Sequence, residues 1–338
     1  MINLNYIGSK LSLIDFLVNT IESVSGKKGS SEVVFADLFA GTGIVGKTFR
    51  SRGYSVISND LQYYSYVINK HYIENNCKVD KKIVEKLNNL EGKKGFVYKN
   101  YCLGSGSNRN YFSDKNGQKC DAIRDKIEDM LKSREINERE YFSLLAALLN
   151  SVDKCANTAS VYGAFLKDIK KSARNIFNLE LLPVSKGPIG KVYNENITDL
   201  ISKIEGDILY LDPPYNSRQY CSNYHLLETI AKNDSPKIKG KTGLRVDDEK
   251  QKSSFCSKRT VYESLEKIIK DAKFEWIFLS YNNEGLLTLE EIKEIMERYG
   301  TYSIHTKEYK RFKADKTENR KHKASVTIEY LHCLHKIK

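Results

Sequence analysis

The sequence predicts an α/β fold in which a mostly parallel sheet is interrupted by a long, largely helical insertion. Short apolar runs alternate with helical segments up to about residue 75 and again from residue 191, and this alternation is typical of parallel sheets. Residues 76–190 carry mostly polar helical patterns instead. With 338 residues, of which 40% are apolar, the chain can form about two structural units with a substantial core.

The N-terminal part is expected to form a helix followed by one βαβα unit. Ile14, Leu17, Val18 and Ile21 recur at helical spacing, so residues 11–24 should form an amphipathic helix. The elements expected after it are a strand at 33–36, a glycine loop, a helix at 44–52, a strand at 54–58 and a helix that runs through residue 72.

The α/β pattern returns after the insertion. The expected elements there are strands at 208–211 and 276–281, a helix at 288–299 and an alternating apolar pattern at 326–332. Inside the insertion, a loop rich in Gly, Ser and Asn at 104–110 precedes an apolar helix at 141–152. These patterns contain no internal repeat and no low-complexity tract.

The charge is strongly positive and concentrated in two segments. Lys and Arg outnumber Asp and Glu by 55 to 43, which gives a net charge of +12 and favours polyanionic partners. Residues 237–259 and 305–323 each have a net charge of +5. Either segment alone is typical of a solvated face. Together with neighbouring aromatic residues they predict a nucleic-acid groove, with Lys310, Arg311 and Lys313 as candidate phosphate contacts.

The seven cysteines are scattered and include no Cys-x-x-Cys pair, so we expect free thiols in a reducing compartment and no metal site. Lys10, Asp15 and Glu22 interrupt the apolar residues near the N-terminus, and no apolar stretch approaches the ~18 residues of a membrane span. We therefore expect a cytoplasmic protein with no membrane partner.

A glycine-rich motif points to a nucleotide-like cofactor. The segment from Asp37 to Gly46 contains Gly41-x-Gly43-x-x-Gly46 between a predicted strand and a predicted helix, where glycines let the backbone approach a ligand closely. Asp60 ends the next predicted strand, where a carboxylate can accept hydrogen bonds from two ribose hydroxyls. This much suits a nicotinamide dinucleotide or S-adenosylmethionine equally.

The sequence Asp212-Pro213-Pro214-Tyr215 favours S-adenosylmethionine, because it offers a place for an amino group that is to be methylated. It follows an apolar strand, so it lies at the sheet edge where α/β folds bind ligands. The Asp212 carboxylate and the Pro213 carbonyl can accept both N–H donors of an exocyclic amino group, which localises its lone pair for attack on a sulfonium methyl. Pro214 fixes the backbone, and Tyr215 offers a ring for stacking on an extruded base.

With these motifs in this order, the sequence resembles the amino-methylating DNA adenine methyltransferases of type II restriction-modification systems. The resemblance covers nearly the whole chain and implies a Rossmann-like fold that binds S-adenosylmethionine. It implies a catalytic domain at 1–75 and 191–338, an inserted target-recognition region at 76–190, and DNA-contacting basic segments at 237–259 and 305–323. The implied partners are double-stranded DNA and a companion restriction endonuclease for the same site, with no metal cofactor.

The resemblance also assigns residues. Residues 5–10 match an N-terminal motif whose aromatic residue and lysine approach the methionine portion of the cofactor, and residues 37–43 match the cofactor loop. Residues 279–283 resemble the strand that lines the base pocket, and residues 146–166 and 216–228 resemble the type II subset. The cofactor-binding residues implied are Tyr6, Lys10, Asp37, Phe39, Gly41, Gly43, Asp60 and Asn196, and the implied DNA contacts include Arg218 and Tyr220.

One position departs from the pattern, and two alternatives stay open. Asn196 stands where the family often has an acid that binds the cofactor adenine, so Glu195 or Asp199 could take that role. An RNA guanine amino-methyltransferase can carry a similar glycine loop and Asp-Pro-Pro-Tyr, although it has no place for the insertion. The other alternative is a binding module without catalysis. Cytosine-ring methylation is excluded, because it needs a cysteine after proline and none of the five prolines precedes Cys.

Overall fold

The computed structural model describes residues 6, 8–246, 251–310 and 326–337 and confirms the predicted α/β fold. Its main sheet has seven strands in the order β3-β2-β1-β4-β7-β9-β8. The first five run parallel, and β9 is antiparallel to both of its neighbours. The strands are β1 (Val34–Asp37), β2 (Ser55–Asn59), β3 (Lys191–Tyr193), β4 (Glu205–Leu211), β7 (Lys273–Asn282), β8 (Gly300–Lys310) and β9 (Val326–Lys336).

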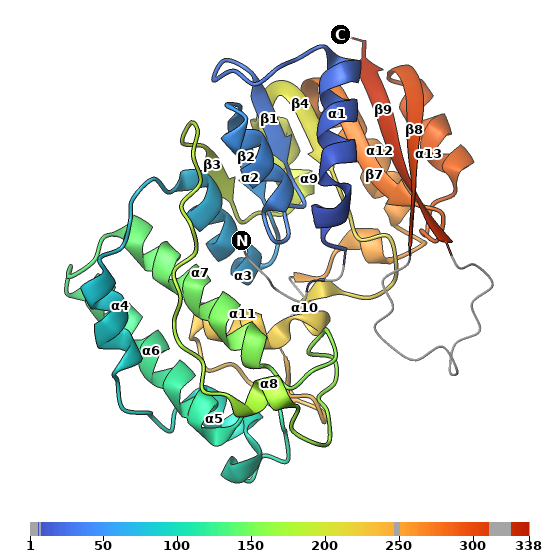
Figure 1. Ribbon diagram of the computed structural model, residues 1–338. Coiled ribbons are helices and arrows are strands. Elements are labelled where there is room, and N and C mark those ends of the chain that lie inside the picture. The colour runs from blue at the N-terminus through green and yellow to red at the C-terminus, as the bar shows by residue number, and fades with distance from the viewer. Residues whose placement is uncertain (1–5, 7, 247–250, 311–325, 338) are drawn as a thin grey trace. The chain divides into compact units, whose positions relative to one another are not determined.

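The described chain divides into two compact units, and the main sheet belongs to the second, which comprises residues 9–61, 186–219 and 252–338. Figure 1 shows α1 (Ile14–Ser25) and α2 (Ile44–Ser51) on one face of this sheet. On the other face α9 (Ile197–Leu200), α12 (Val261–Asp271) and α13 (Leu289–Glu297) pack into a core that includes Leu209, Ile277 and Ile295. Burial of both faces explains why the central strands are nearly continuous apolar runs.

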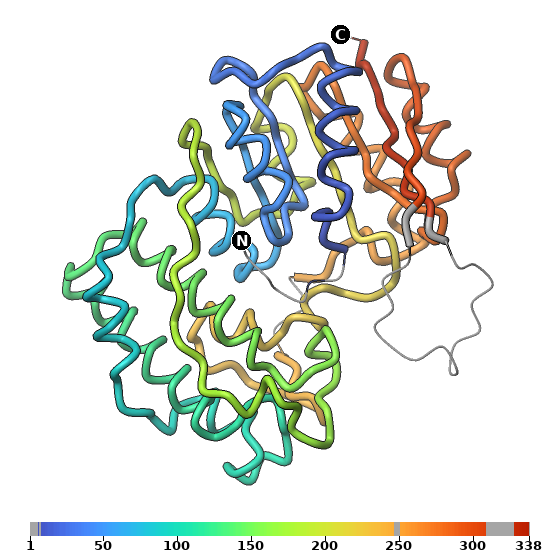
Figure 2. The backbone as a smooth tube through the Cα atoms, in the orientation of Figure 1, coloured from blue at the N-terminus to red at the C-terminus, as the bar shows by residue number. Residues whose placement is uncertain are grey.

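The other unit comprises residues 1–8, 62–185 and 220–251 and is mostly helical. Figure 2 follows its chain from blue through green to the yellow and orange segment that returns to it. The predicted apolar helix is α7, almost wholly buried and closed at its start by a reciprocal capping box between Asn137 and Glu140. The helices are α3 (Tyr63–Asn69), α4 (Lys81–Asn88), α5 (Phe96–Tyr101), α6 (Asp114–Lys132), α7 (Glu138–Cys155), α8 (Lys171–Arg174), α10 (Tyr220–Asn223) and α11 (His225–Lys232).

The helical unit is larger than the predicted insertion of 76–190. It also holds residues 1–8, 62–75 and 220–251, the last of which include a short hairpin of β5 (Ile238–Lys239) and β6 (Leu244–Arg245), whereas residues 186–190 belong to the other unit. Helix α11 packs against both α3 and α7, so the returning segment is part of the unit's core. Its role in target recognition stays a prediction.

The C-terminal basic segment, residues 305–323, begins within a strand. Its first residues lie in β8, a polar strand at the sheet edge that pairs with β9 along its whole length. Exposed polar side chains, including Lys307, are typical of edge strands. The rest of the segment, residues 311–323, lies outside the described residues. Within the described part of the chain, no helix is both long and apolar enough to cross a membrane.

Candidate functional site

Three parallel strands of the main sheet end side by side, and each end carries a predicted site residue. Asp37 is the last residue of β1 and pairs in register with Ser58 of β2 and Tyr210 of β4. Asp60 follows β2 directly, and Asp212 follows β4 directly. Because the carboxyl ends of parallel strands meet at one edge, the structure brings together three acids that lie far apart in the sequence.

The loop after β1 is built on two glycines with left-handed backbone. Gly41 has φ of 51° and Gly43 has φ of 73°, a region that other residues adopt only with strain. The Gly43 N–H donates to the Ala40 carbonyl at 2.8 Å, and the Gly41 N–H donates to Oδ2 of Asp60 at 2.8 Å. The predicted cofactor loop is therefore tied directly to the predicted ribose-binding acid.

Asp37 is a buried carboxylate that is only half satisfied. Its side chain is 1% exposed, and Oδ2 accepts the Gly46 N–H at 3.1 Å, while the buried Oδ1 has no hydrogen-bond partner among the residues that the structure describes. Burial raises the pKa of Asp37 to about 8; the charges of Asp212 and Asp60 add to this shift, and the Gly46 N–H opposes it. A buried acceptor in this state suits a donor that arrives with a ligand, and a cationic donor best of all.

Asp212 forms a buried ion-pair network with Lys10 and Glu329. The Lys10 Nζ lies 3.0 Å from Oδ1 of Asp212 and 2.8 Å from Oε1 of Glu329. The side chains of Lys10, Asp212 and Glu329 are 6%, 17% and 1% exposed. Burial raises the pKa of Asp212 to about 6, against the opposing charge of Lys10 and with a contribution from Glu329. Burial alone would lower the pKa of Lys10, but the two carboxylates hold it well above its ordinary value.

Aromatic rings stand beside these acids in the same unit. The Tyr215 ring is half-buried and meets the Tyr281 ring edge to face, with 6.5 Å between the ring centroids. The backbone carbonyl of Tyr215 accepts the Leu286 N–H at 2.9 Å. The Phe39 ring meets Phe255 edge to face at 5.1 Å. Backbone and ring contacts thus hold Tyr215 and Phe39, which the sequence assigns to base and cofactor, and Tyr281 belongs to the segment 279–283 that was expected to line the base pocket.

The remaining predicted site residues lie in several places. In the helical unit, the Tyr6 ring stacks on Tyr224 at 4.7 Å and tilts against Tyr220 at 5.5 Å. Arg218 is exposed, and its N–H donates to the Asn216 side chain. The Lys310 backbone lies in β8, and its side chain, like Arg311 and Lys313, falls outside the described residues.

Asn196 has a clear local role. It is exposed and caps α9, with its side-chain oxygen accepting the Thr198 N–H at 3.1 Å and the Thr198 hydroxyl at 3.0 Å. Nearby, Glu195 pairs with Lys203 at 2.7 Å. A cofactor adenine would therefore compete with two donors for the Asn196 oxygen, and its binding role stays a prediction.

Glu329 is the site residue that sequence reasoning missed. The predicted alternation at 326–332 drew attention to the even-numbered positions, whereas Glu329 lies on the other face of β9 with the buried Leu331 and Cys333. A carboxylate within a buried apolar stripe needs a cation, and that signal was available in the sequence.

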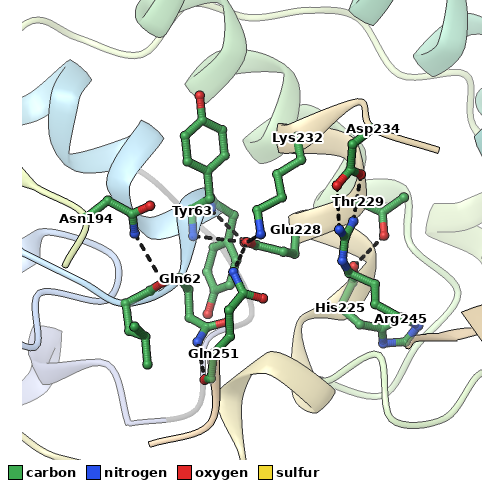
Figure 3. Close-up of polar contacts among 12 residues, drawn as sticks. Gln62, Tyr63, Asn194, His225, Glu228, Thr229, Lys232, Asp234, Arg245 and Gln251 are labelled. Atoms are coloured by element: carbon green, nitrogen blue, oxygen red, sulfur yellow. Dashed lines mark hydrogen bonds and ion pairs between the residues drawn. The ribbon is translucent and has the colours of Figure 1, made fainter. Parts of the chain in front are cut away.

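The run 216–228, matched above to type II enzymes, ends in a structural anchor of the helical unit. Glu228 is fully buried, and its carboxylate accepts the N–H groups of Tyr63 and Tyr64 at the start of α3, at 3.2 and 2.9 Å. Lys232 pairs with the same carboxylate at 2.8 Å, and the Gln251 amide donates to it (Figure 3). These contacts fasten α11 to α3.

The comparisons with known proteins agree with one another. The model of the D12 class N6 adenine-specific DNA methyltransferase family matches residues 6–311. The chain is 53% identical to the type II methyltransferase M.NlaIII of Neisseria lactamica, over 98% of this chain and 99% of that protein. It is 39% identical to M.CviAII of Paramecium bursaria Chlorella virus 1, over 93% and 94%. It is 41% identical to M.FokI of Planomicrobium okeanokoites over 98% of this chain, which spans 53% of M.FokI.

Proposed function

The chain belongs to the D12 class of N6 adenine-specific DNA methyltransferases, and from this membership we propose how its strand-end residues divide the work of the reaction. The enzyme transfers a methyl group from S-adenosylmethionine to the amino group of adenine in DNA, as a methyltransferase of the type II restriction-modification class. This membership decides against RNA guanine methylation and against a binding module without catalysis.

The β1 and β2 ends are proposed to hold the cofactor. S-adenosylmethionine carries an ammonium group and a sulfonium and, when bound, supplies the methyl group. The unpaired, buried Oδ1 of Asp37 suits its ammonium group, and Asp60 suits its ribose hydroxyls. The left-handed Gly41 and Gly43 let the main chain approach closely, and Phe39 offers an apolar ring beside them. Among the described residues, no cluster of three or more His, Cys, Asp or Glu side chains could hold a metal ion.

The β4 end is proposed to hold the target base. The observation that carries this proposal is the position of Asp212, one residue beyond β4 and beside the end of β1. Its Oδ1 pairs with Lys10, so Oδ2 is the oxygen to accept one amino N–H, while the Pro213 carbonyl accepts the other. These two bonds draw the nitrogen towards tetrahedral geometry and localise its lone pair for in-line attack on the methyl carbon. Pro214 holds the turn, and the Tyr215 ring stacks on the base, which must leave the duplex to reach this edge.

The helical unit is proposed to contact double-stranded DNA. Lys237, Lys239 and Lys241 are exposed around the β5–β6 hairpin. Arg109, from the Gly/Ser/Asn loop, donates to the carbonyls of Gly240 and Lys241 at 3.0 and 3.1 Å, so hairpin and loop form one basic surface. Such a surface suits phosphates. We further propose that the enzyme acts on cellular DNA in the cytoplasm and protects its site from a companion endonuclease.

Product analysis tests this proposal. Unmethylated genomic DNA incubated with the enzyme and S-adenosylmethionine should yield N6-methyladenine by nucleoside mass spectrometry, and methylation-sensitive sequencing should find it at one short site. Asp212→Ala should reduce the product to background. Asp207→Asn, which changes a carboxylate of the same strand that pairs with Lys27 instead of Lys10, should not. Full activity of Asp212→Ala would contradict the assignment of Asp212 to the base.

A further inference from the structure

Glu329 is the third member of the buried network that Lys10 forms with Asp212, and the methylation reaction by itself does not explain its role. Lys10 is the first residue of a short 3-10 helix, Lys10–Leu13, and reaches its partners through a flexible four-carbon side chain. Glu329, by contrast, lies within β9, where the strand register places it opposite Asn282 of β7 and Lys307 of β8. The Glu329 carboxylate is therefore held in place by its strand, and the position of the Lys10 ammonium depends on Glu329 and Asp212.

The acids at this edge make the position of Lys10 critical. Asp37 and Asp212 lie at neighbouring strand ends, and the charge of Asp212 acts on Asp37, so an unanchored Lys10 ammonium would have Asp37 as an alternative partner. Pairing with Asp37 would fill the acceptor that the cofactor ammonium group needs. The ammonium instead lies 2.8 Å from Glu329 and 3.0 Å from Oδ1 of Asp212, so both carboxylates hold it at the β4 end.

We propose that Glu329 is a positioning residue for methyl transfer, which holds Lys10 against Asp212 and so fixes the carboxylate that binds the target amino group. This inference rests on the proposed role of Asp212. Glu329 acts through Lys10 and does not itself touch the base or the cofactor.

The pH dependence separates positioning from a simple charge effect. The negative charge of Glu329 raises the pKa of Asp212, and the positive charge of Lys10 lowers it. If Glu329 acted only as a charge, its removal would lower this pKa and shift the acid limb of the rate to lower pH. If its removal releases Lys10, the pKa rises and the limb shifts to higher pH. Within the described part of the chain, the other ionisable groups that interact with Asp212 are Asp37, Tyr210 and Tyr215, and all three remain in every variant below.

A double-mutant cycle tests the inference with the intact enzyme, a duplex that carries its methylation site, and saturating S-adenosylmethionine. The single-turnover rate is measured between pH 5 and 9 for Glu329→Leu, Lys10→Met and the double variant. Glu329→Leu should lower the plateau rate by roughly tenfold or more and move the acid limb to higher pH. The double variant should be no slower than the slower single variant, because Glu329 acts only through Lys10. Glu329→Gln, which keeps an acceptor oxygen, should recover part of the rate.

Controls separate the possible failures. Glu275→Gln removes a carboxylate that pairs with Lys27 at 2.9 Å elsewhere in the same unit and should leave rate and pH profile unchanged. Dissociation constants for S-adenosylmethionine should stay within about twofold for Glu329→Leu, Glu329→Gln and Glu275→Gln, which also shows that these three variants fold. If Glu329→Leu alone fails to fold, the inference is tested by comparing the rates of Lys10→Met and the double variant, which should be equal if Glu329 acts only through Lys10.

Additive losses, a wild-type rate for Glu329→Leu, or an acid limb displaced to lower pH would each overturn the inference. Asp212→Asn is measured in the same assay. If it kept its rate, the proposed role of Asp212 itself would fail; if it is inactive while the Glu329 variants are not impaired, only the positioning role fails.

Discussion

At the residue scale, Asp37 shows how a binding site can cost stability before its ligand arrives. Its pKa of about 8 means that the folded protein resists ionisation of this carboxyl. Below pH 8 a proton must leave Asp37 before the carboxylate can pair with the cofactor ammonium group. The affinity for S-adenosylmethionine should therefore rise with pH up to about 8, by at most tenfold per pH unit. Calorimetry at pH 6–8, in buffers of different ionisation enthalpy, measures both the affinity and the released proton.

Asp37→Asn provides the matched control. It should remove the pH dependence and weaken binding, while the ligand-free protein becomes more stable. Because the pKa of Asp37 is raised on folding, its contribution to the stability of the folded protein is fully present below the ordinary pKa near 3.8 and is lost as the pH rises through 8. The gain in melting temperature should thus be larger at pH 8 than at pH 5. An affinity that is flat with pH in the wild type would contradict this role of Asp37.

Tyr215 offers a second test at this scale. Its predicted function uses the ring face for stacking, so Tyr215→Phe should keep most of the single-turnover rate. Tyr215→Ala should lose about 1–3 kcal/mol of base binding, roughly 5- to 150-fold. The fluorescence of 2-aminopurine at the target position should increase on binding to the wild type and less so with Tyr215→Ala. Equal losses for Phe and Ala would show that the hydroxyl carries the role.

At the scale of elements, the structure explains which parts of the fold the sequence could predict. The strands β1, β4 and β7 are largely apolar runs because both faces of the sheet are covered, and pattern reading finds such runs. Strand β8 was missed because it is a polar edge strand, and β3 because three residues carry too little pattern. The position of Lys10 beside Asp212 depends on Glu329 from the far end of the chain, a contact that no local pattern encodes.

The extent of the helical unit could not be predicted for the same reason. The segment 220–251 joins it through the buried Glu228, which closes the start of α3 from a distant part of the chain. Its sequence was compatible with either unit. By contrast, the sequence predicted that Asp37, Asp60 and Asp212 each lie at the end of a strand, and the strand order of the structure places these three ends side by side.

The loop at 156–170 depends on one buried side chain. Asn157 donates to the carbonyls of Asn110 and Leu166 at 2.9 and 3.0 Å and accepts the Lys170 N–H at 2.9 Å. Asn157→Ala should cost about 1–3 kcal/mol for each main-chain group left unpaired. Amide hydrogen exchange of this loop should accelerate, and discrimination between target and non-target duplexes should decrease. The exposed Asn178→Ala should change neither; full protection of the loop in Asn157→Ala would refute this account.

At the scale of the whole molecule, the charge of +12 predicts that much of the DNA affinity is independent of sequence. Replacing Lys237, Lys239 and Lys241 by Gln should weaken binding to every duplex alike. It should also reduce the slope of log affinity against log salt by up to ~0.9 for each phosphate that is no longer neutralised. Fluorescence anisotropy at 50–200 mM salt measures this slope. The equally exposed Lys81 and Lys82 of α4 serve as the control.

The same experiment applies to Lys310, Arg311 and Lys313, which the sequence predicts as phosphate contacts. Their replacement should also lower the salt slope without changing the methylated site. If either set of changes altered which sequence is methylated, these residues would read bases, and the division between general affinity and recognition would be wrong.

The central claim is that the carboxyl ends of three neighbouring strands serve different partners, with Asp37 and Asp60 at the ends of β1 and β2 for the cofactor and Asp212 at the end of β4 for the base. It is tested most directly by measuring, in one preparation of Asp212→Asn, the single-turnover rate of methyl transfer and the dissociation constant of S-adenosylmethionine. The account predicts a rate reduced by on the order of 10²-fold or more, with a dissociation constant within about twofold of the wild type. A dissociation constant that rises in proportion to the fall in rate, or a rate that is retained, would contradict it.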